Sequence, residues 1–224
     1  ADATVNMTML ALYFVLLHGV TGERDLVIGT PVRGRNQTEL EAVMGYFTNL
    51  VPLYLTLTPE RTFIEFVREV KRVVIDSFGN PDVPLEYLQS ELKRVHGSDA
   101  LLYQALFSFQ DARQRKTDWS GLDHEQILLF QRGATEDLGL WFLENAKGMV
   151  GGVIYNADIF RADTACMLRE RYLELMASVL ADPRRSISAL TRVGATAPAN
   201  EVAPSPMTVD LARSSASLHA LFEQ

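Results

Sequence analysis

The chain has 224 residues, 47% of them hydrophobic and 22% charged, which is an ordinary globular composition with enough length for one substantial core. Its net charge of -7 lacks the basic excess of nucleic-acid-binding proteins, so we expect no nucleic-acid partner. The one cysteine, Cys166, can form no disulfide within the chain and builds no metal site with four scattered histidines; we expect it to fill the core of a protein of the reduced cytoplasm.

Residues 4–20 predict a buried helix, because they are almost entirely apolar and end in Thr21 and Gly22, a helix-stop signal. The most apolar part, residues 7–20, is too short to span a bilayer. No positive residue precedes it, which argues against a secretory signal, and we expect no membrane partner. A globular domain rarely begins with its most buried helix, so we expect this N-terminus to be a cut within a larger fold.

Residues 26–30 predict a strand that ends at the turn-forming sequence Gly-Thr-Pro, followed by a loop over residues 31–37. Gly29 and Gly34 have the spacing of a phosphate-binding loop. However, Arg and Asn follow where such a loop needs Lys and Ser or Thr, and Pro31 removes one backbone N–H. A nucleotide-binding protein is therefore the least favoured alternative.

The next segment predicts a short helix over residues 39–44, with Thr38 as its cap and Glu41 completing a capping box. Residues 47–57 then form a long apolar run that is interrupted by polar residues and proline. Because Asn and Pro are poor choices for a central strand, we expect an edge strand or a strand that lines a ligand site.

Thr62 is placed to cap a strongly amphipathic helix that ends before the sequence Gly-Asn-Pro at 79–81. A second helix is expected to begin near Pro84, with Leu85, Leu88 and Leu92 facing inward.

The second half of the chain predicts four strands, a hairpin turn and a long helix. The strands are expected over residues 103–111, 126–131, 137–144 and 149–155, with the turn at 145–148. Asp163 or Thr164 is placed to cap a helix through residue 180. Residues 191–216 are rich in Ala, Pro, Ser and Thr and predict a linker, after which an amphipathic helix begins at residue 217.

Several of these segments together resemble one family. The sequence GTPVRGR at 29–35, followed by MGYFTN at 44–49, is similar to two consecutive signatures of the condensation domains of nonribosomal peptide synthetases. Further matches are NPDVPLE at 80–86, LYQ at 102–104 and YNADIF at 155–160, and residues 217–223 resemble the start of an adenylation domain. In that family the domain joins two carrier-bound acyl groups by an amide bond, in the biosynthesis of secondary metabolites.

The resemblance implies an α/β fold, the C-terminal half of a chloramphenicol-acetyltransferase-like pair of lobes, with a mixed sheet and helices mainly on one side. It divides the chain into a lobe (1–190), a linker (191–216) and the start of an adenylation-like domain (217–224). The catalytic signature of the family, His-His-x-x-x-Asp-Gly, does not occur in this sequence. We therefore expect the chain to form no amide bonds alone. The alternatives are an epimerising or cyclising relative and a non-catalytic scaffold or carrier-docking lobe.

The resemblance also implies site residues. Gly45, Phe47 and Asn49 would line the substrate tunnel, although Asn49 could instead satisfy irregular backbone. Arg33 and Arg35 would contact the N-terminal lobe or a carrier's phosphopantetheine phosphate, unless they are simply solvated. The implied partners are that lobe, upstream and downstream carrier proteins with their phosphopantetheine arms, and the adenylation domain, with no metal and no directly bound cofactor.

The sequence departs from the family pattern at two positions: Tyr54 stands where Arg is usual, and Pro81 where Gln is usual.

Overall fold

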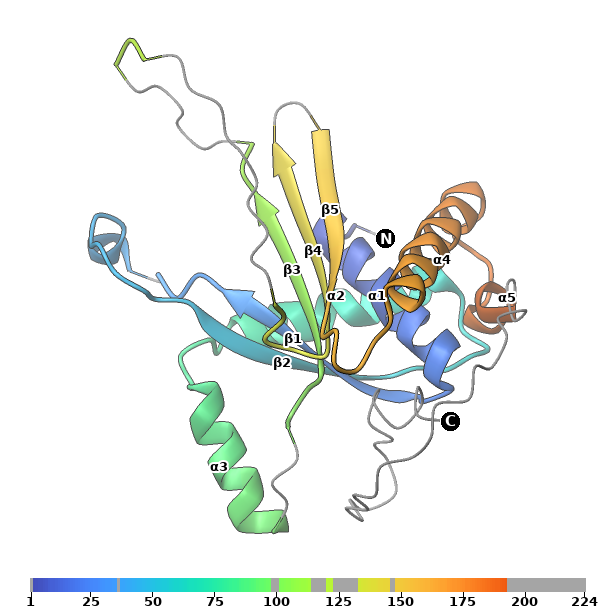
Figure 1. The fold of residues 1–224 in the computed structure, drawn as a ribbon, viewed down its shortest axis with the longest axis horizontal. Helices are drawn as coiled ribbons and strands as arrows, with labels where there is room; N and C mark the ends of the chain where they lie inside the picture. The colour runs from blue at the N-terminus through green and yellow to red at the C-terminus, as the bar shows by residue number, and fades with distance from the viewer. Residues whose placement is uncertain are drawn as a thin grey trace.

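The computed structural model describes residues 2–35, 37–97, 101–113, 120–122, 133–145 and 148–192. Within these residues one mixed sheet carries its helices mainly on one face (Figure 1). The strand order is β2-β1-β3-β4-β5. In chain order the elements are α1 (Val5–Thr21), β1 (Asp25–Val32), the 3-10 helix η1 (Thr38–Leu40), β2 (Asn49–Thr56), α2 (Phe63–Phe78), α3 (Leu85–His96), β3 (Ala105–Asp111), β4 (Leu138–Asn145), β5 (Gly148–Tyr155), α4 (Ala162–Ala181) and α5 (Ile187–Arg192).

The sheet combines antiparallel and parallel pairs. β1 pairs antiparallel with β2 along its full length, and β4 pairs antiparallel with β5, whereas β3 runs parallel to both β1 and β4. β2 lies at the edge of the sheet, which confirms one of the two predicted places for it. β1 continues two residues past its predicted end, because Pro31 and Val32 still pair with Leu50 and Asn49.

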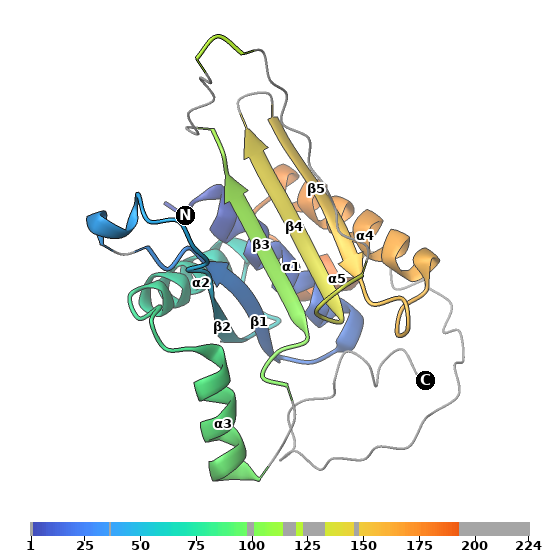
Figure 2. The same ribbon diagram turned by 60° about the vertical axis from the view of Figure 1, so that its left-hand side comes forward.

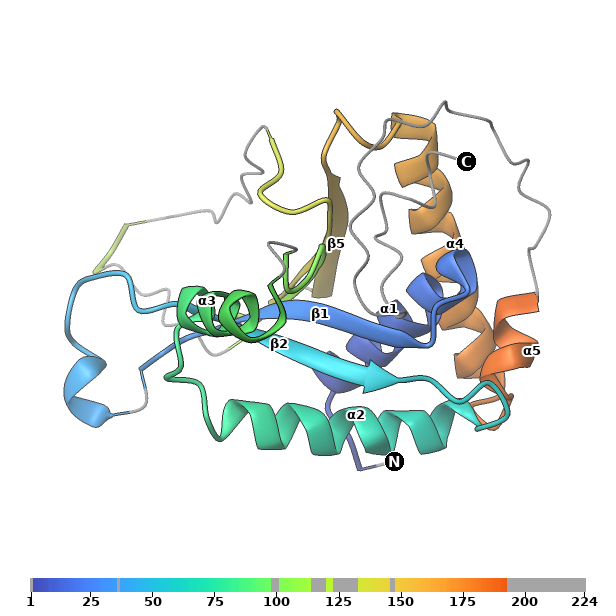
Figure 3. The same ribbon diagram turned by 90° about the horizontal axis from the view of Figure 1, so that it is seen from below.

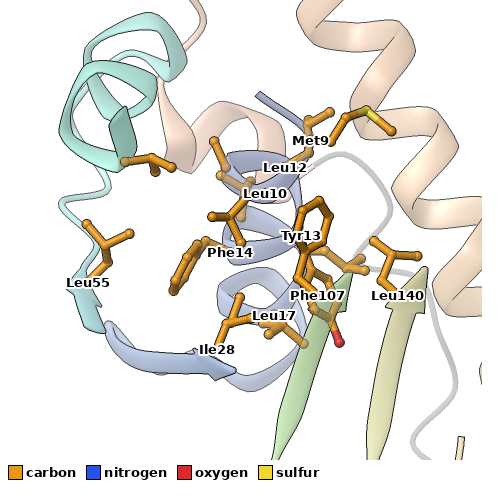
Figure 4. Packing of buried hydrophobic residues seen from close by; sticks show 14 of the residues in the cluster. Met9, Leu10, Leu12, Tyr13, Phe14, Leu17, Ile28, Leu55, Phe107 and Leu140 are labelled. Carbon is orange, nitrogen blue, oxygen red and sulfur yellow. The ribbon is translucent and has the colours of Figure 1, made fainter. Parts of the chain in front are cut away.

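The hydrophobic core lies between the sheet and the helices α1, α2 and α4. Figures 2 and 3 show from two directions how these helices lie against the sheet. The nine consecutive residues 9–17 of α1 are all buried, because α1 contacts the sheet as well as α2, α4 and α5. This confirms the predicted buried helix. Figure 4 shows Phe14 and Tyr13 on different sides of α1, with Tyr13 next to Phe107 of β3.

Two buried tyrosines in this core have their hydroxyl groups satisfied. The Tyr13 hydroxyl donates to the Leu138 carbonyl oxygen at 3.3 Å, and the Tyr172 hydroxyl donates to the Met9 carbonyl oxygen at 2.9 Å. Burial raises the pKa of both phenols well above the ordinary value, so both stay neutral and act as donors.

The amphipathic helix predicted after Thr62 is confirmed as α2. Thr62 accepts a hydrogen bond from the Glu65 backbone N–H, and the Glu65 carboxylate accepts one from the Thr62 N–H, so the N-terminus carries a full capping box. The predicted hairpin is also confirmed, since β4 and β5 pair up to Asn145 and Gly148.

Two predicted helix starts are wrong. The short helix is a 3-10 turn that begins at Thr38, and Gln37 precedes it without a side-chain cap. The expected capping box fails because the Glu41 carboxylate binds Arg33 instead, at 3.1 Å. The long helix α4 has Arg161 as its N-cap residue, so neither Asp163 nor Thr164 caps it; the Asp163 carboxylate pairs with Arg161 at 3.1 Å.

Two predictions of buried side chains are also wrong. Cys166 is exposed, because α4 turns Ala165 and Leu168 to the core and the two positions between them point outward. Leu92 is 40% exposed, and none of the described side chains of α3 is buried. The helix α3 extends away from the sheet (Figures 1 and 2) and contacts it mainly at β2.

The strand expected over residues 126–131 lies outside the described residues. So do the expected linker and the adenylation-like start, apart from Thr191 and Arg192, which form the last turn of α5. Among the helices that the structure describes, none has the length and apolar character to cross a membrane.

Candidate functional site

The predicted site lies where β1 ends and β2 begins. Val32 and Asn49 form the last pair of this antiparallel ladder, and the intervening loop carries η1 away from the sheet edge (Figures 1 and 3). The loop is compact although it is exposed, because its own side chains hold it together.

Arg35 is the organising residue of this loop. One guanidinium nitrogen donates to the Leu40 carbonyl oxygen and to the Val43 carbonyl oxygen, the latter at 2.7 Å, and the other donates to the Gly45 carbonyl oxygen at 3.1 Å. The guanidinium carbon also lies 4.2 Å from the centre of the Phe47 ring. The planar, five-donor group of Arg suits this cradle of carbonyls and an aromatic face.

Arg33 behaves differently from Arg35. It pairs with Glu41 at 3.1 Å, and both side chains are largely exposed. Such surface ion pairs contribute little to stability, so the Arg33 charge stays accessible at the outside of the loop.

Gly34 belongs to the GTPVRGR signature at 29–35, but it is not among the site residues predicted from the sequence. Its φ of 61° lies in the left-handed region, and a Cβ at this position would clash with the carbonyl oxygen of Phe47. The sequence does contain a signal for this role, because Gly34 stands between two arginines just after a predicted strand. Gly34 therefore allows the two sides of the loop to approach each other.

The structure brings Gly45 and Phe47 together with Arg35 but turns Asn49 elsewhere. The half-buried Asn49 side chain donates from Nδ2 to the carbonyl oxygens of Pro81 and Val83, each at 2.8 Å. These hydrogen bonds satisfy irregular backbone, which is the second of the two roles that the sequence left open for Asn49.

The loop presents apolar side chains that the sequence reasoning did not single out. Met44 is 99% exposed and Tyr46 is 87% exposed, and Val43 is exposed as well. Exposed apolar groups on a loop with a fixed shape are typical of a surface that binds another protein.

On the sheet face opposite the core helices, Tyr103 packs directly over Gly29. A Cβ on Gly29 would lie 2.5 Å from the Tyr103 ring, so only glycine fits beneath it. Burial, together with the charges of Glu136 and Glu86, raises the pKa of Tyr103 to about 12. The phenol is therefore a neutral hydrogen-bonding group at neutral pH.

Tyr54, which replaces the usual Arg, belongs to a small polar cluster. The hydroxyl groups of Tyr54 and Thr56 donate to the same Asp25 carboxylate oxygen, at 2.7 Å and 2.5 Å. The bond from Thr56, followed by that from Tyr54, lowers the pKa of Asp25. Neutral hydroxyl donors thus satisfy the Asp25 carboxylate.

The remaining polar candidates have structural roles or lie outside the described residues. His18 Nδ1 lies 2.6 Å from the Glu23 carbonyl oxygen, beyond the end of α1. The side chains of His96, His124 and His219 are not among those described. In the described part of the chain, no three His, Cys, Asp or Glu side chains gather to form a metal site.

A mixed sheet flanked by helices is the fold that this chain shares with solved condensation-domain structures. The family model described as "Condensation domain" matches residues 1–198. The chain therefore belongs to the condensation-domain family, and the predicted chloramphenicol-acetyltransferase-like fold is confirmed.

Individual relatives agree with this assignment. The chain is 34% identical over 196 residues to a linear gramicidin synthase protein of Brevibacillus parabrevis, covering 86% of this chain but 4% of that protein. The condensation domain of the Monacolin K polyketide synthase MokA superposes with a TM-score of 0.72 at 23% identity, covering 83% of this chain and 43% of that one. A complex of the X-domain and OxyB from teicoplanin biosynthesis gives a TM-score of 0.71 at 28% identity, covering 85% of this chain and 43% of that one.

Proposed function

We propose that this chain is the C-terminal lobe of a condensation domain in a nonribosomal peptide synthetase. The family match over residues 1–198 carries this proposal. Coverage of 43% of a condensation-domain structure fits one lobe of two. In the assembled domain, the amine of one carrier-bound aminoacyl group attacks the thioester carbonyl of another. A C–N bond forms and the C–S bond breaks. The products are the amide and a free phosphopantetheine thiol, whose sulfur receives the proton that the amine loses.

The chain's own contribution is a wall of the site and not the proton-transferring group. The signature His-His-x-x-x-Asp-Gly is absent from the sequence, and we assign it to the N-terminal lobe. The group that we propose to take the proton of the attacking amine therefore belongs to the N-terminal lobe. We therefore infer that this chain is inactive on its own.

The loop between β1 and β2 is the proposed contact with the N-terminal lobe. Arg35 and Gly34 fix its shape, and Met44 and Tyr46 are the apolar groups that it presents. In this proposal Gly45 and Phe47 form the tunnel side of the loop, and Arg33 remains available to the other lobe or to a carrier's phosphopantetheine phosphate. The carrier proteins and a following adenylation domain complete the proposed set of partners, and no directly bound cofactor is proposed.

We expect Met44→Asp to weaken the association of this chain with the N-terminal lobe by about tenfold or more, since a buried unpaired charge replaces an apolar contact. Isothermal titration calorimetry of the two separately prepared lobes measures the effect. Leu180→Asp is the matched control, because Leu180 is 78% exposed on α4, away from the loop. Equal affinity of the Met44→Asp and Leu180→Asp variants would show that the loop is not the contact.

A second candidate function is a non-catalytic docking lobe of the same fold. The observation that favours it is the 28% identity to the structure in which an X-domain is bound to OxyB. In that case the lobe would bind a partner protein, and no amide bond would form even in the assembled domain.

A further inference from the structure

α3 is unusual among the long helices of this fold because none of its described side chains is buried. Its contacts with the rest of the fold lie mainly at β2. Figures 1 and 2 show it leaving the body of the protein at an angle to the sheet. Apolar burial in α3 is limited to leucines that are only half-buried, Leu85 and Leu88 in its first turn. The position of α3 therefore depends mainly on how its N-terminal end is attached.

That attachment runs through residues 79–84, the connection between α2 and α3. Pro81 and Pro84 have no backbone N–H, so this connection offers carbonyl oxygens more readily than donors. The Pro84 carbonyl oxygen accepts hydrogen bonds from the Tyr87 and Leu88 N–H groups in the first turn of α3, at 3.1 and 3.2 Å. The carbonyl oxygens of Pro81 and Val83 point instead to the sheet.

Both of these carbonyl oxygens are bound by one side chain, Asn49. Its Nδ2 lies 2.8 Å from each, although they are 32 and 34 residues away in the sequence. A side-chain amide has two N–H donors, and here both are used on two carbonyls spaced two residues apart. Asn49 itself is held by the ladder, since it pairs with Val32 at the end of β1.

We propose that Asn49 is a positioning residue that fixes the direction of α3 relative to the sheet. It does so by joining the rigid start of β2 to the segment from which α3 begins. Any effect of Asn49 on amide formation would pass through α3, and that consequence rests on the proposed function, whereas the effect on the position of α3 does not.

The test measures the distance between α3 and α4 with two spin labels. One label is placed on Cys166, the single cysteine of the chain, which is exposed on α4; the other is placed on a Val95→Cys variant, because Val95 is 61% exposed on α3. With Asn49 present we expect one narrow distance. Asn49→Asp keeps the shape but removes both donors, and we expect the narrow peak to be lost while the melting temperature changes little.

Asn80→Ala is the matched control, because the Asn80 side chain donates to the Asp76 carbonyl oxygen within α2 and does not bind the sheet. Asn80→Ala should keep the narrow distance.

If Asn49→Asp does not fold, Asn49→Ala removes the donors without adding a charge and has the same expected outcome. A narrow distance at the same position in the Asn49 variant would overturn the proposal. A broad distance that appears only together with cooperative unfolding of the whole lobe would overturn it too. Inactivity of the assembled domain would contradict the proposed function but would not alter this readout.

Discussion

Phe14→Ala is expected to lower the free energy of unfolding by about 3–5 kcal/mol, the range for a buried phenylalanine replaced by alanine. Phe14 is fully buried in α1, and its ring meets Phe66 of α2 edge-on, with the ring centres 6.2 Å apart. Figure 4 shows it directed to the side of the core that β1 and β2 close. The cavity would lie where helix and sheet layers meet, so little can move in to fill it.

Urea unfolding followed by circular dichroism measures this change, with an unchanged denaturant slope as evidence that the two-state transition is kept. Val5→Ala provides the comparison within the same helix, because Val5 is 50% exposed and its truncation should cost less than about 0.5 kcal/mol. Similar losses for the two variants would mean that α1 is not the centre of the core.

Gly34→Ala should be the most damaging single change in the candidate site. The left-handed conformation alone costs a non-glycine residue about 1–2 kcal/mol, and forcing a Cβ against the Phe47 carbonyl oxygen adds about 1–3 kcal/mol. Since neither backbone can retreat without opening the end of the β1–β2 ladder, we expect the contact between Arg35 and Phe47 to be lost as well.

Gly22→Ala separates these two costs. Gly22 has a φ of 75°, and nothing lies within 4 Å of the position that its Cβ would take. It should show the conformational cost alone, so the unfolding free energy of Gly34→Ala should be lower than that of Gly22→Ala. Chemical shifts of the Phe47 ring report the loop directly. Equal losses, with unchanged Phe47 shifts, would argue against the close approach at Gly34.

The parts of the fold that the sequence predicted well are those fixed by local chemistry. Thr62 and Glu65 are three residues apart, and their capping box needs nothing from elsewhere in the chain. The unbroken apolar run of α1 likewise predicts burial on all sides, whatever covers it.

The parts that the sequence did not predict depend on contacts between distant residues. For Asn49 the sequence left two roles open, a tunnel residue or one that satisfies irregular backbone. Its hydrogen-bond partners lie more than 30 residues away, and no local pattern indicates which they are. Cys166 was predicted to be buried because a cysteine without a disulfide or metal partner usually fills a core. One position along a helix is a turn of about 100°, enough to place it on the surface. In α3, periodicity predicts an apolar face but not whether another element covers it.

The most direct test of the central claim is an assay of amide formation between two carrier-bound substrates, by mass spectrometry of the carriers after a single turnover. The 224-residue chain is measured alone and together with an N-terminal lobe that carries an intact His-His-x-x-x-Asp-Gly signature. We predict no amide from the chain alone and amide formation by the two lobes together. Condensation by the chain alone would contradict the account, and so would a pair of associated lobes that forms no amide, the result expected of a docking lobe.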